Sequence, residues 1–280
     1  AEGHTPESLE KRAGQIARYL VWQGIYMQMS YGRPAGKETP MVAITGQSRA
    51  EIEQALGGLD AVIGLANSPR RFVISGLPDA LEQVVRRLEA RSKKEFSAFE
   101  KGLSDRPRSL GVEWLAVSAP YHSPAMAKAL PLMQAKAKQL GFQPSPKPLK
   151  VPMLRFETGD VWAGEDLCVS QSVNSVQWPA AMKGLLAFSP THVIDAGPGA
   201  GVSAVSALCL RGEGVQVIAG ATDEGERRLM TQNESDLMPP QPWTVFAPVV
   251  VERPDGERVL ENEFTRRTGR QPIWLPGITP

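Results

Sequence analysis

Histidine is the side chain best suited to take a proton at neutral pH, and the chain contains three histidines. His4 lies in the N-terminal tail and His192 at the start of an expected strand, and neither position suggests catalysis. His122 follows an apolar segment, residues 112–117, where the chain turns toward an expected helix. Sites in α/β sheets are built at strand ends. His122 is therefore the candidate general base, although a lone histidine can also be purely structural.

A sequence close to a nucleophile elbow lies at Gly46-Gln47-Ser48-Arg49-Ala50, after an expected strand and within one residue of G-x-S-x-G. The segment Ser48-Arg49-Ala50-Glu51 is also a capping box, in which the serine and glutamate side chains each bind a free backbone N–H. The final glycine of the elbow is alanine here. We therefore expect Ser48 to cap a helix.

A glycine-rich turn, residues 197–201, follows an expected strand that ends at Asp195. Such a turn can bind phosphate or simply allow close packing. Pro198 removes an amide donor from the middle of the turn, which favours packing. Asp195 could also be the third member of a catalytic triad, but acidic residues before such turns are common.

The composition excludes several classes of function. Lys+Arg 31 against Asp+Glu 30 leaves a formal charge of +1, so no basic field exists to hold nucleic acid or an acidic membrane. No apolar run approaches the roughly 18 residues that span a bilayer, and the first residues lack the features of a signal peptide. Cys168 and Cys209 are too few for a disulfide framework or a structural zinc site. We expect a cytoplasmic protein with no metal site and no membrane or nucleic-acid partner.

The first half of the sequence predicts a long helix and then a βαββαβ unit. After the N-cap Thr5-Pro6, the helix carries an apolar stripe of Leu9, Ala13, Ile16, Leu20 and Met27. The expected unit has strands 41–45, 61–66, 71–75 and 112–117 and helices 48–56 and 78–91. A tight turn at Asn67-Ser68-Pro69 would make it a ferredoxin-like split βαβ subdomain. The charged stretch 92–108 is expected to be a solvated loop or a frayed helix.

The second half alternates strands with longer helices, which predicts a mainly parallel sheet covered on both faces. The expected helices are 123–140, 167–188 and one ending near 210, and the expected strands are 151–156, 191–196 and 215–219. We assign residues 1–40 and 112–238 to an α/β core that is incomplete at its N-terminus. Residues 41–111 form the inserted ferredoxin-like subdomain, and residues 239–280 form a linker and the start of another domain.

Several segments resemble acyl-CoA:carrier-protein acyltransferases, most closely the acyltransferase region of type I fatty acid synthases of the fungal beta-subunit and actinobacterial kind. They are 64–76 (GLANSPRRFVISG), 118–123 (SAPYHS), 174–178 (NSVQW) and 192–199 (HVIDAGPG), in the family's order and at about its spacing. Residues 264–280 (FTRRTGRQPIWLPGITP) resemble the entry to the flavin-dependent enoyl reductase domain of those synthases. The resemblance implies an α/β-hydrolase-like acyltransferase core.

The resemblance also implies ping-pong transfer of an acyl group from acyl-CoA to the phosphopantetheine thiol of an acyl carrier protein, with no bound cofactor. His122 matches the histidine that takes a proton from the serine of G-H-S-x-G. Asn174 matches the residue whose backbone carbonyl orients that imidazole. Asn67, Tyr121 and Ser123 match residues around the acyl pocket.

The serine of that motif has no counterpart here. In the family it precedes the helix that begins at Thr5, and Ala1-Glu2-Gly3-His4 cannot represent it. We expect the nucleophile to lie on an upstream segment of the synthase, and the chain alone to be inactive. The alternatives are a non-catalytic structural or carrier-docking remnant and, less favoured, an independent hydrolase that uses Ser48, His122 and Asp195.

Gln23 lies on the apolar stripe of the first helix, between Leu20 and Met27. A polar residue that faces a core needs a partner or a role. The segment 21–28 (VWQGIYMQ) resembles the one in malonyl transferases where an arginine precedes the glycine and binds the malonyl carboxylate. The glutamine therefore implies an uncharged acyl group such as acetyl, unless Gln23 only binds neighbouring backbone.

Overall fold

The computed structural model describes residues 6–32, 39–141, 151–164, 167–230, 249–252 and 258–261. The expected cap at Thr5, most of the linker and the enoyl-reductase-like segment 264–280 lie outside these ranges. The elements are α1 (Pro6–Tyr31), β1 (Met41–Thr45), α2 (Arg49–Leu56), β2 (Ala61–Ser68), β3 (Arg71–Gly76), α3 (Pro78–Glu100), β4 (Gly111–Trp114), the 3₁₀ helix η1 (Pro124–Ala129), α4 (Leu130–Gln139), α5 (Leu167–Ser172), β5 (Val176–Gln177), α6 (Trp178–Leu186), β6 (His192–Asp195), α7 (Gly201–Cys209), β7 (Gln216–Ala219), α8 (Asp223–Met230), β8 (Val249–Glu252) and β9 (Arg258–Glu261).

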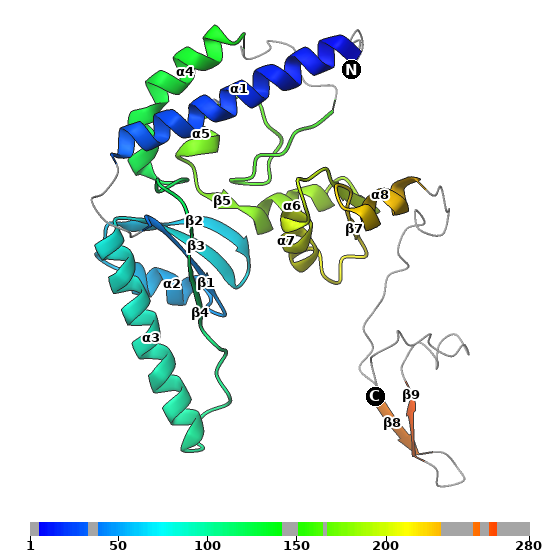
Figure 1. The fold of residues 1–280 in the computed structure, drawn as a ribbon. Coiled ribbons are helices and arrows are strands. Elements are labelled where there is room, and N and C mark those ends of the chain that lie inside the picture. The colour runs from blue at the N-terminus through cyan, green and yellow to red at the C-terminus, as the bar shows by residue number, and fades with distance from the viewer. Residues whose placement is uncertain are drawn as a thin grey trace.

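The predicted βαββαβ unit folds as an antiparallel sheet in the order β4-β1-β3-β2, with α2 and α3 on one face (Figure 1). This is the strand order of a ferredoxin-like fold, as the sequence predicts. β2 is longer than expected, because its pairing with β3 continues to Ser68 opposite Arg71. Asn67 is therefore a strand residue, and the turn is made by Pro69 and Arg70.

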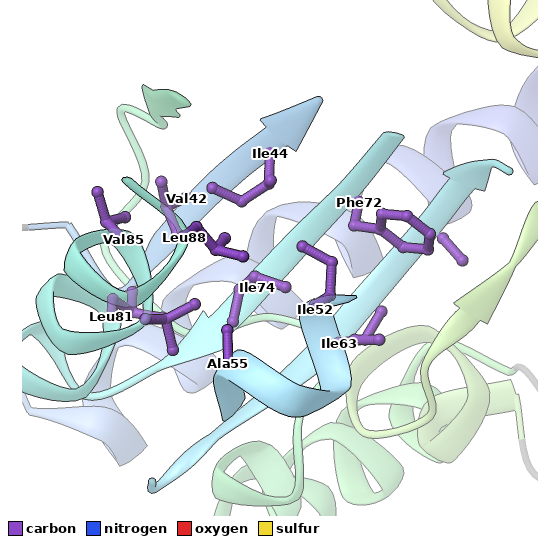
Figure 2. Close-up of a cluster of buried hydrophobic side chains, with 12 residues drawn as sticks. Val42, Ile44, Ile52, Ala55, Ile63, Phe72, Ile74, Leu81, Val85 and Leu88 are labelled. Carbon is purple, nitrogen blue, oxygen red and sulfur yellow. The ribbon is translucent and has the colours of Figure 1, made fainter. Parts of the chain in front are cut away.

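Apolar side chains of this sheet pack directly against those of α2 and α3 (Figure 2). Val42, Ile44 and Ile74 from the strands are fully buried, as are Ile52 of α2 and Leu81 of α3. Burying one such side chain contributes roughly 1.5–3 kcal/mol. The cluster therefore holds β2 firmly in the sheet, and β2 is the strand to which the candidate site is attached.

Of the two alternatives expected for the charged stretch 92–108, a helix is correct as far as Glu100, and a loop is correct from residue 101 onward. Arg91 explains part of the extension, because its guanidinium contacts Glu95 one turn later at 2.7 Å and Glu51 of α2 at 2.9 Å. Ion pairs at this spacing support a helix by a few tenths of a kcal/mol each. A charged sequence without an apolar stripe can therefore remain helical.

Helix α1 lies beside α4 (Figure 1). The Gln15 amide donates to the carbonyl of Leu140 at 3.0 Å. Among the α1 side chains that the structure describes, Tyr19, Gln23 and Met27 are buried, spaced by one turn. Ile16 and Leu20 are 48% and 51% exposed, and Ala13 is exposed too, so the expected stripe is wrong for these three residues. The buried face instead packs on Ala119 and Met126, in the segment that contains His122.

A fifth strand, β5, runs parallel to β2 and extends the sheet in the order β4-β1-β3-β2-β5. The expected helix 167–188 is wrong, because α5 ends at Ser172 and α6 begins only at Trp178. Pro179 lies in the first turn of α6. In a continuous helix its ring would clash with the carbonyl four residues earlier, so the chain must leave the helix here.

The expected strand 151–156 is also wrong, since the chain forms only an isolated bridge between Leu154 and Val161, which closes a turn. Further along, β6 and β7 pair in parallel, and α7 and α8 contact this pair. That arrangement agrees with the predicted α/β core. The searched part of the chain contains no helix long and apolar enough to cross a membrane.

Candidate active site

The backbone of His122 is held in an unusual conformation between β4 and η1. Its φ angle is 57°, in the left-handed region that residues other than glycine seldom adopt. Its N–H donates to the carbonyl of Ser172 at the end of α5, at 2.9 Å. A strained residue persists only where its surroundings fix its conformation. Here the hydrogen bond to the end of α5 helps to fix the backbone of His122.

The imidazole of His122 is oriented by the main chain of Asn174. Its Nδ1 atom lies 3.0 Å from the Asn174 carbonyl oxygen. A carbonyl can only accept a hydrogen bond, so Nδ1 carries the hydrogen and Nε2 keeps a free lone pair. The edge of the Phe156 ring packs on the imidazole, with ring centroids 5.9 Å apart and planes at 88°.

The surroundings of His122 keep its ring neutral at physiological pH. Burial has the largest effect and lowers the pKa of His122 below its ordinary value of 6.5. The Asn174 carbonyl and the Glu157 carboxylate favour the protonated ring but do not cancel this effect. A neutral imidazole with Nε2 unprotonated is the form that can accept a proton from a substrate or a nucleophile.

The break between α5 and α6 is what makes the Asn174 carbonyl available. In a continuous helix this carbonyl would bind the N–H four residues later. Instead, Val176 pairs with Leu65 of β2, and the Ser175 hydroxyl donates to the Ile63 carbonyl at 2.7 Å. The edge of the ferredoxin-like sheet therefore sets the position of the group that holds His122.

Glu157 is a member of the site that the sequence analysis missed. Its side chain is only 10% exposed and lies 3.6 Å from the guanidinium of Arg155. Its Oε1 atom accepts hydrogen bonds from the Asn174 amide at 3.0 Å and from the Ser170 hydroxyl. Burial acts to raise the pKa of Glu157, but these hydrogen bonds outweigh it and hold the pKa below its ordinary value. The only sequence signal is an acidic residue next to the turn Thr158-Gly159-Asp160, which is too common to be noticed.

Two further predicted site residues flank His122 and are held by backbone contacts. The carbonyl of Tyr121 accepts a hydrogen bond from the Ser75 hydroxyl at 2.7 Å, which joins the site to β3. Ser123 is buried, and its hydroxyl donates to the Pro120 carbonyl at 2.5 Å. Both contacts stabilise the chain around His122, and the substrate-binding roles of Tyr121 and Ser123 stay predictions.

Gln23 and Asn67 lie on different elements. Gln23 is 8% exposed, and its amide has no hydrogen-bond partner in the part of the chain that the structure describes. Asn67 is half-buried at the end of β2, and its carbonyl accepts from the Cys209 thiol of α7 at 3.4 Å. Their roles toward a substrate also stay predictions.

Ser48 and Asp195, considered above as members of a triad, both serve as caps. The Ser48 hydroxyl accepts from the Glu51 N–H, and the Glu51 carboxylate accepts from the Ser48 N–H, so the predicted capping box is confirmed. The Asp195 carboxylate accepts from the backbone N–H of Gly197 at 2.9 Å and of Ser203 at 2.7 Å. It therefore closes the glycine-rich turn onto α7. Among the described residues, no cluster of metal-ligating side chains was found.

The chain is similar to fungal fatty acid synthase beta subunits. It is 25% identical over 275 residues to the fatty acid synthase subunit beta of Saccharomyces cerevisiae, an alignment that covers 88% of this chain and 13% of the relative. The subunit of Schizosaccharomyces pombe is 28% identical over 239 residues, covering 78% of this chain and 11% of the relative. The predicted resemblance is confirmed, and the chain spans only about an eighth of these relatives. No protein-family model matches it.

Solved structures show the same fold at low identity. The malonyl-CoA:acyl carrier protein transacylase of Xanthomonas oryzae superposes with a TM-score of 0.59 at 22% identity, covering 78% of this chain and 64% of that one. A malonyl-transacylase in complex with a type II polyketide synthase acyl carrier protein gives a TM-score of 0.61 at 18% identity, with coverages of 77% and 64%. The predicted acyltransferase fold is confirmed.

Proposed function

We propose that this chain is the histidine-bearing part of an acyltransferase that moves an acyl group from acyl-CoA to the phosphopantetheine thiol of an acyl carrier protein in a type I fatty acid synthase. The observation that carries the proposal is the contact between Nδ1 of His122 and the Asn174 carbonyl oxygen, 3.0 Å apart. Because a carbonyl only accepts, this contact favours the hydrogen on Nδ1 and leaves Nε2 available to act as a base. Similarity to the beta subunits and to the transacylase structures supports the same reaction class.

In the proposed first half-reaction, Nε2 of His122 takes the proton of a serine hydroxyl while the serine oxygen attacks the thioester carbonyl. The carbon–sulfur bond to coenzyme A then breaks, and the imidazolium returns the proton to the leaving sulfur. In the second half, the phosphopantetheine thiol gives its proton to Nε2 and attacks the acyl-serine. The serine oxygen leaves and recovers that proton.

We propose that the serine lies outside these 280 residues, on another part of the synthase. Two serines that adjoin His122 and Asn174 support this, because their hydroxyls already have other partners. Ser172 donates to the Cys168 carbonyl, and Ser175 to the Ile63 carbonyl. Ser48 of the elbow-like sequence occupies its hydroxyl in the capping box.

We also propose that the acyl group is uncharged, acetyl-like, and that Gln23 contributes to this choice. An arginine would offer a bidentate charge to a malonyl carboxylate, whereas a glutamine amide leaves a buried carboxylate without a counter-charge. Gln23 is buried on α1 and its amide is free of other described partners, so it can bind a ligand.

The test is transfer of acetyl from acetyl-CoA to a phosphopantetheinylated acyl carrier protein. The assay compares the 280-residue chain with a polypeptide that also contains the residues encoded ahead of Ala1, each with and without His122→Ala. Transfer is expected only in the longer polypeptide with His122 intact. If neither polypeptide transfers acetyl, the alternative of a non-catalytic carrier-docking remnant is favoured. Measuring the binding of the chain to the carrier protein would test that alternative.

A further inference from the structure

Three polar side chains converge on the carboxylate of Glu157. The Asn174 amide reaches its Oε1 atom at 3.0 Å, the Ser170 hydroxyl donates to the same atom, and Arg155 lies 3.6 Å from Oε2. Burying a carboxylate is costly unless it is paired and hydrogen-bonded. The Glu157 carboxylate therefore depends on these partners, and one of them is the side chain of Asn174.

The turn that carries Glu157 is fixed against α6 by close backbone packing. The Arg155 N–H donates to the Asp160 carbonyl at 2.8 Å, and the Gln177 N–H donates to the Phe156 carbonyl at 2.9 Å. A Cβ atom on Gly159 would lie 2.2 Å from the Ala180 carbonyl oxygen. Only glycine allows this approach, so the turn and α6 form one rigid support for the carboxylate.

We propose that Glu157 is a positioning residue for His122, an inference that rests on the proposed function. Its carboxylate fixes the side chain of Asn174, and with it the backbone carbonyl that binds Nδ1. It also supplies the negative charge that stabilises the imidazolium formed when Nε2 takes a proton. In a catalytic triad an acid contacts the histidine directly; here the carbonyl makes the contact and the acid stands behind it.

The charges around the imidazole are consistent with this role. On the 154–161 turn, Glu157 acts on His122 through its charge, and Arg155 is paired with Glu157 itself. The neighbours from α5 and the segment before β5, Ser172 and Asn174, are neutral. Burial alone would make protonation of His122 harder, and Glu157 is the described charge that counters it.

The experiment is an NMR titration of the histidine ring signals of the full 280-residue chain. With three histidines in the sequence, the His122 signal can be assigned from its loss in His122→Gln. We expect Glu157→Gln to move the His122 midpoint to lower pH, Glu157→Asp to restore it largely, and Asp195→Asn to leave it in place. An unchanged midpoint in a folded Glu157→Gln variant would overturn the proposal.

Asn174→Ala provides a second test that does not depend on whether Glu157→Gln folds. This change keeps the backbone carbonyl of residue 174 and removes only the side-chain amide that Glu157 binds. If Asn174 acted through its carbonyl alone, the His122 midpoint would not shift. We expect the His122 midpoint to fall, and no shift would count against the relay.

In the longer polypeptide, Glu157→Gln should lower kcat/KM for transfer by roughly tenfold and move the acidic limb of its pH profile to lower pH. A uniform loss of activity with an unmoved limb would indicate a merely structural role. Because the titration needs no turnover, failure of the proposed function and failure of this inference can be told apart.

Discussion

His122 combines a strained backbone with a ring held from several sides. A left-handed conformation costs a non-glycine residue about 1–3 kcal/mol, and the N–H bond to Ser172 at 2.9 Å helps to offset it. The Asn174 carbonyl and the Phe156 ring then leave the imidazole one orientation. Strain retained at a partly buried ionisable residue supports the role proposed for His122.

At the residue scale, we predict that His122 makes folding less favourable in mild acid. Its pKa is lower in the folded chain than in the unfolded chain, so the unfolded chain binds the proton first as the pH falls below about 6.5. Stability should therefore drop between about pH 7.5 and about pH 5.5. The lowered pKa values of Glu51 and Glu157 act at more acidic pH.

Urea denaturation at the two pH values measures this effect, and His122→Gln is the comparison variant. The variant should lose less stability than the wild type over the same interval. An equal loss in both proteins would mean that His122 has no part in the pH dependence.

A second prediction at this scale concerns the acyl group. In a polypeptide that contains the nucleophile, Gln23→Arg should gain acylation by malonyl-CoA relative to acetyl-CoA, because the arginine supplies the counter-charge that a carboxylate needs. Rates of acylation by the two thioesters measure the preference, with Gln15→Arg on the same helix as the control. A wild type that prefers malonyl, or an arginine variant without a gain, would contradict the role of Gln23.

Single site residues could be predicted only where the neighbouring sequence marks them. His122 follows an expected strand within a recognisable segment, and Gln23 interrupts an expected apolar stripe, so both could be singled out from the sequence. Glu157 could not, because its contact with Asn174 depends on a turn packed against α6 and on a break in a helix. Neither feature leaves a periodic pattern.

At the element scale, the sequence predicted the type of most elements better than their ends. The ferredoxin-like unit has strong alternation, turn residues and a capping box, and its strand order follows from them. The segment 167–188 is apolar enough to suggest one helix, but Pro179 prevents it. That error concealed the most important local feature, the Asn174 carbonyl that binds His122 instead of a helix N–H.

The cap of α2 gives a prediction at this scale. Ser48→Ala removes one half of the capping box and should lower the free energy of unfolding by about 1 kcal/mol. Transfer by the longer polypeptide should remain intact, because Ser48 belongs to the helix end. Thermal or denaturant unfolding together with the transfer assay checks both parts. Lost turnover with unchanged stability would instead make Ser48 a catalytic group.

At the scale of the whole molecule, the site lies where the ferredoxin-like sheet meets the rest of the chain. β5 attaches to the edge of that sheet, and α1 packs on the segment that contains His122. The overall class could be predicted because strand and helix order determine it. The packing of α1 could not, since Ile16 and Leu20 have the spacing of a core stripe and yet are half exposed.

We propose that His122 activates a serine that lies outside these 280 residues. The most direct test of this proposal is intact-protein mass spectrometry after brief incubation with acetyl-CoA. We predict a single acetyl adduct on the longer polypeptide, formed roughly 10²–10⁴-fold more slowly after His122→Ala, and no adduct on the 280-residue chain alone. A stable acetyl adduct on a serine of the 280-residue chain, or equal rates with and without His122, would contradict the account.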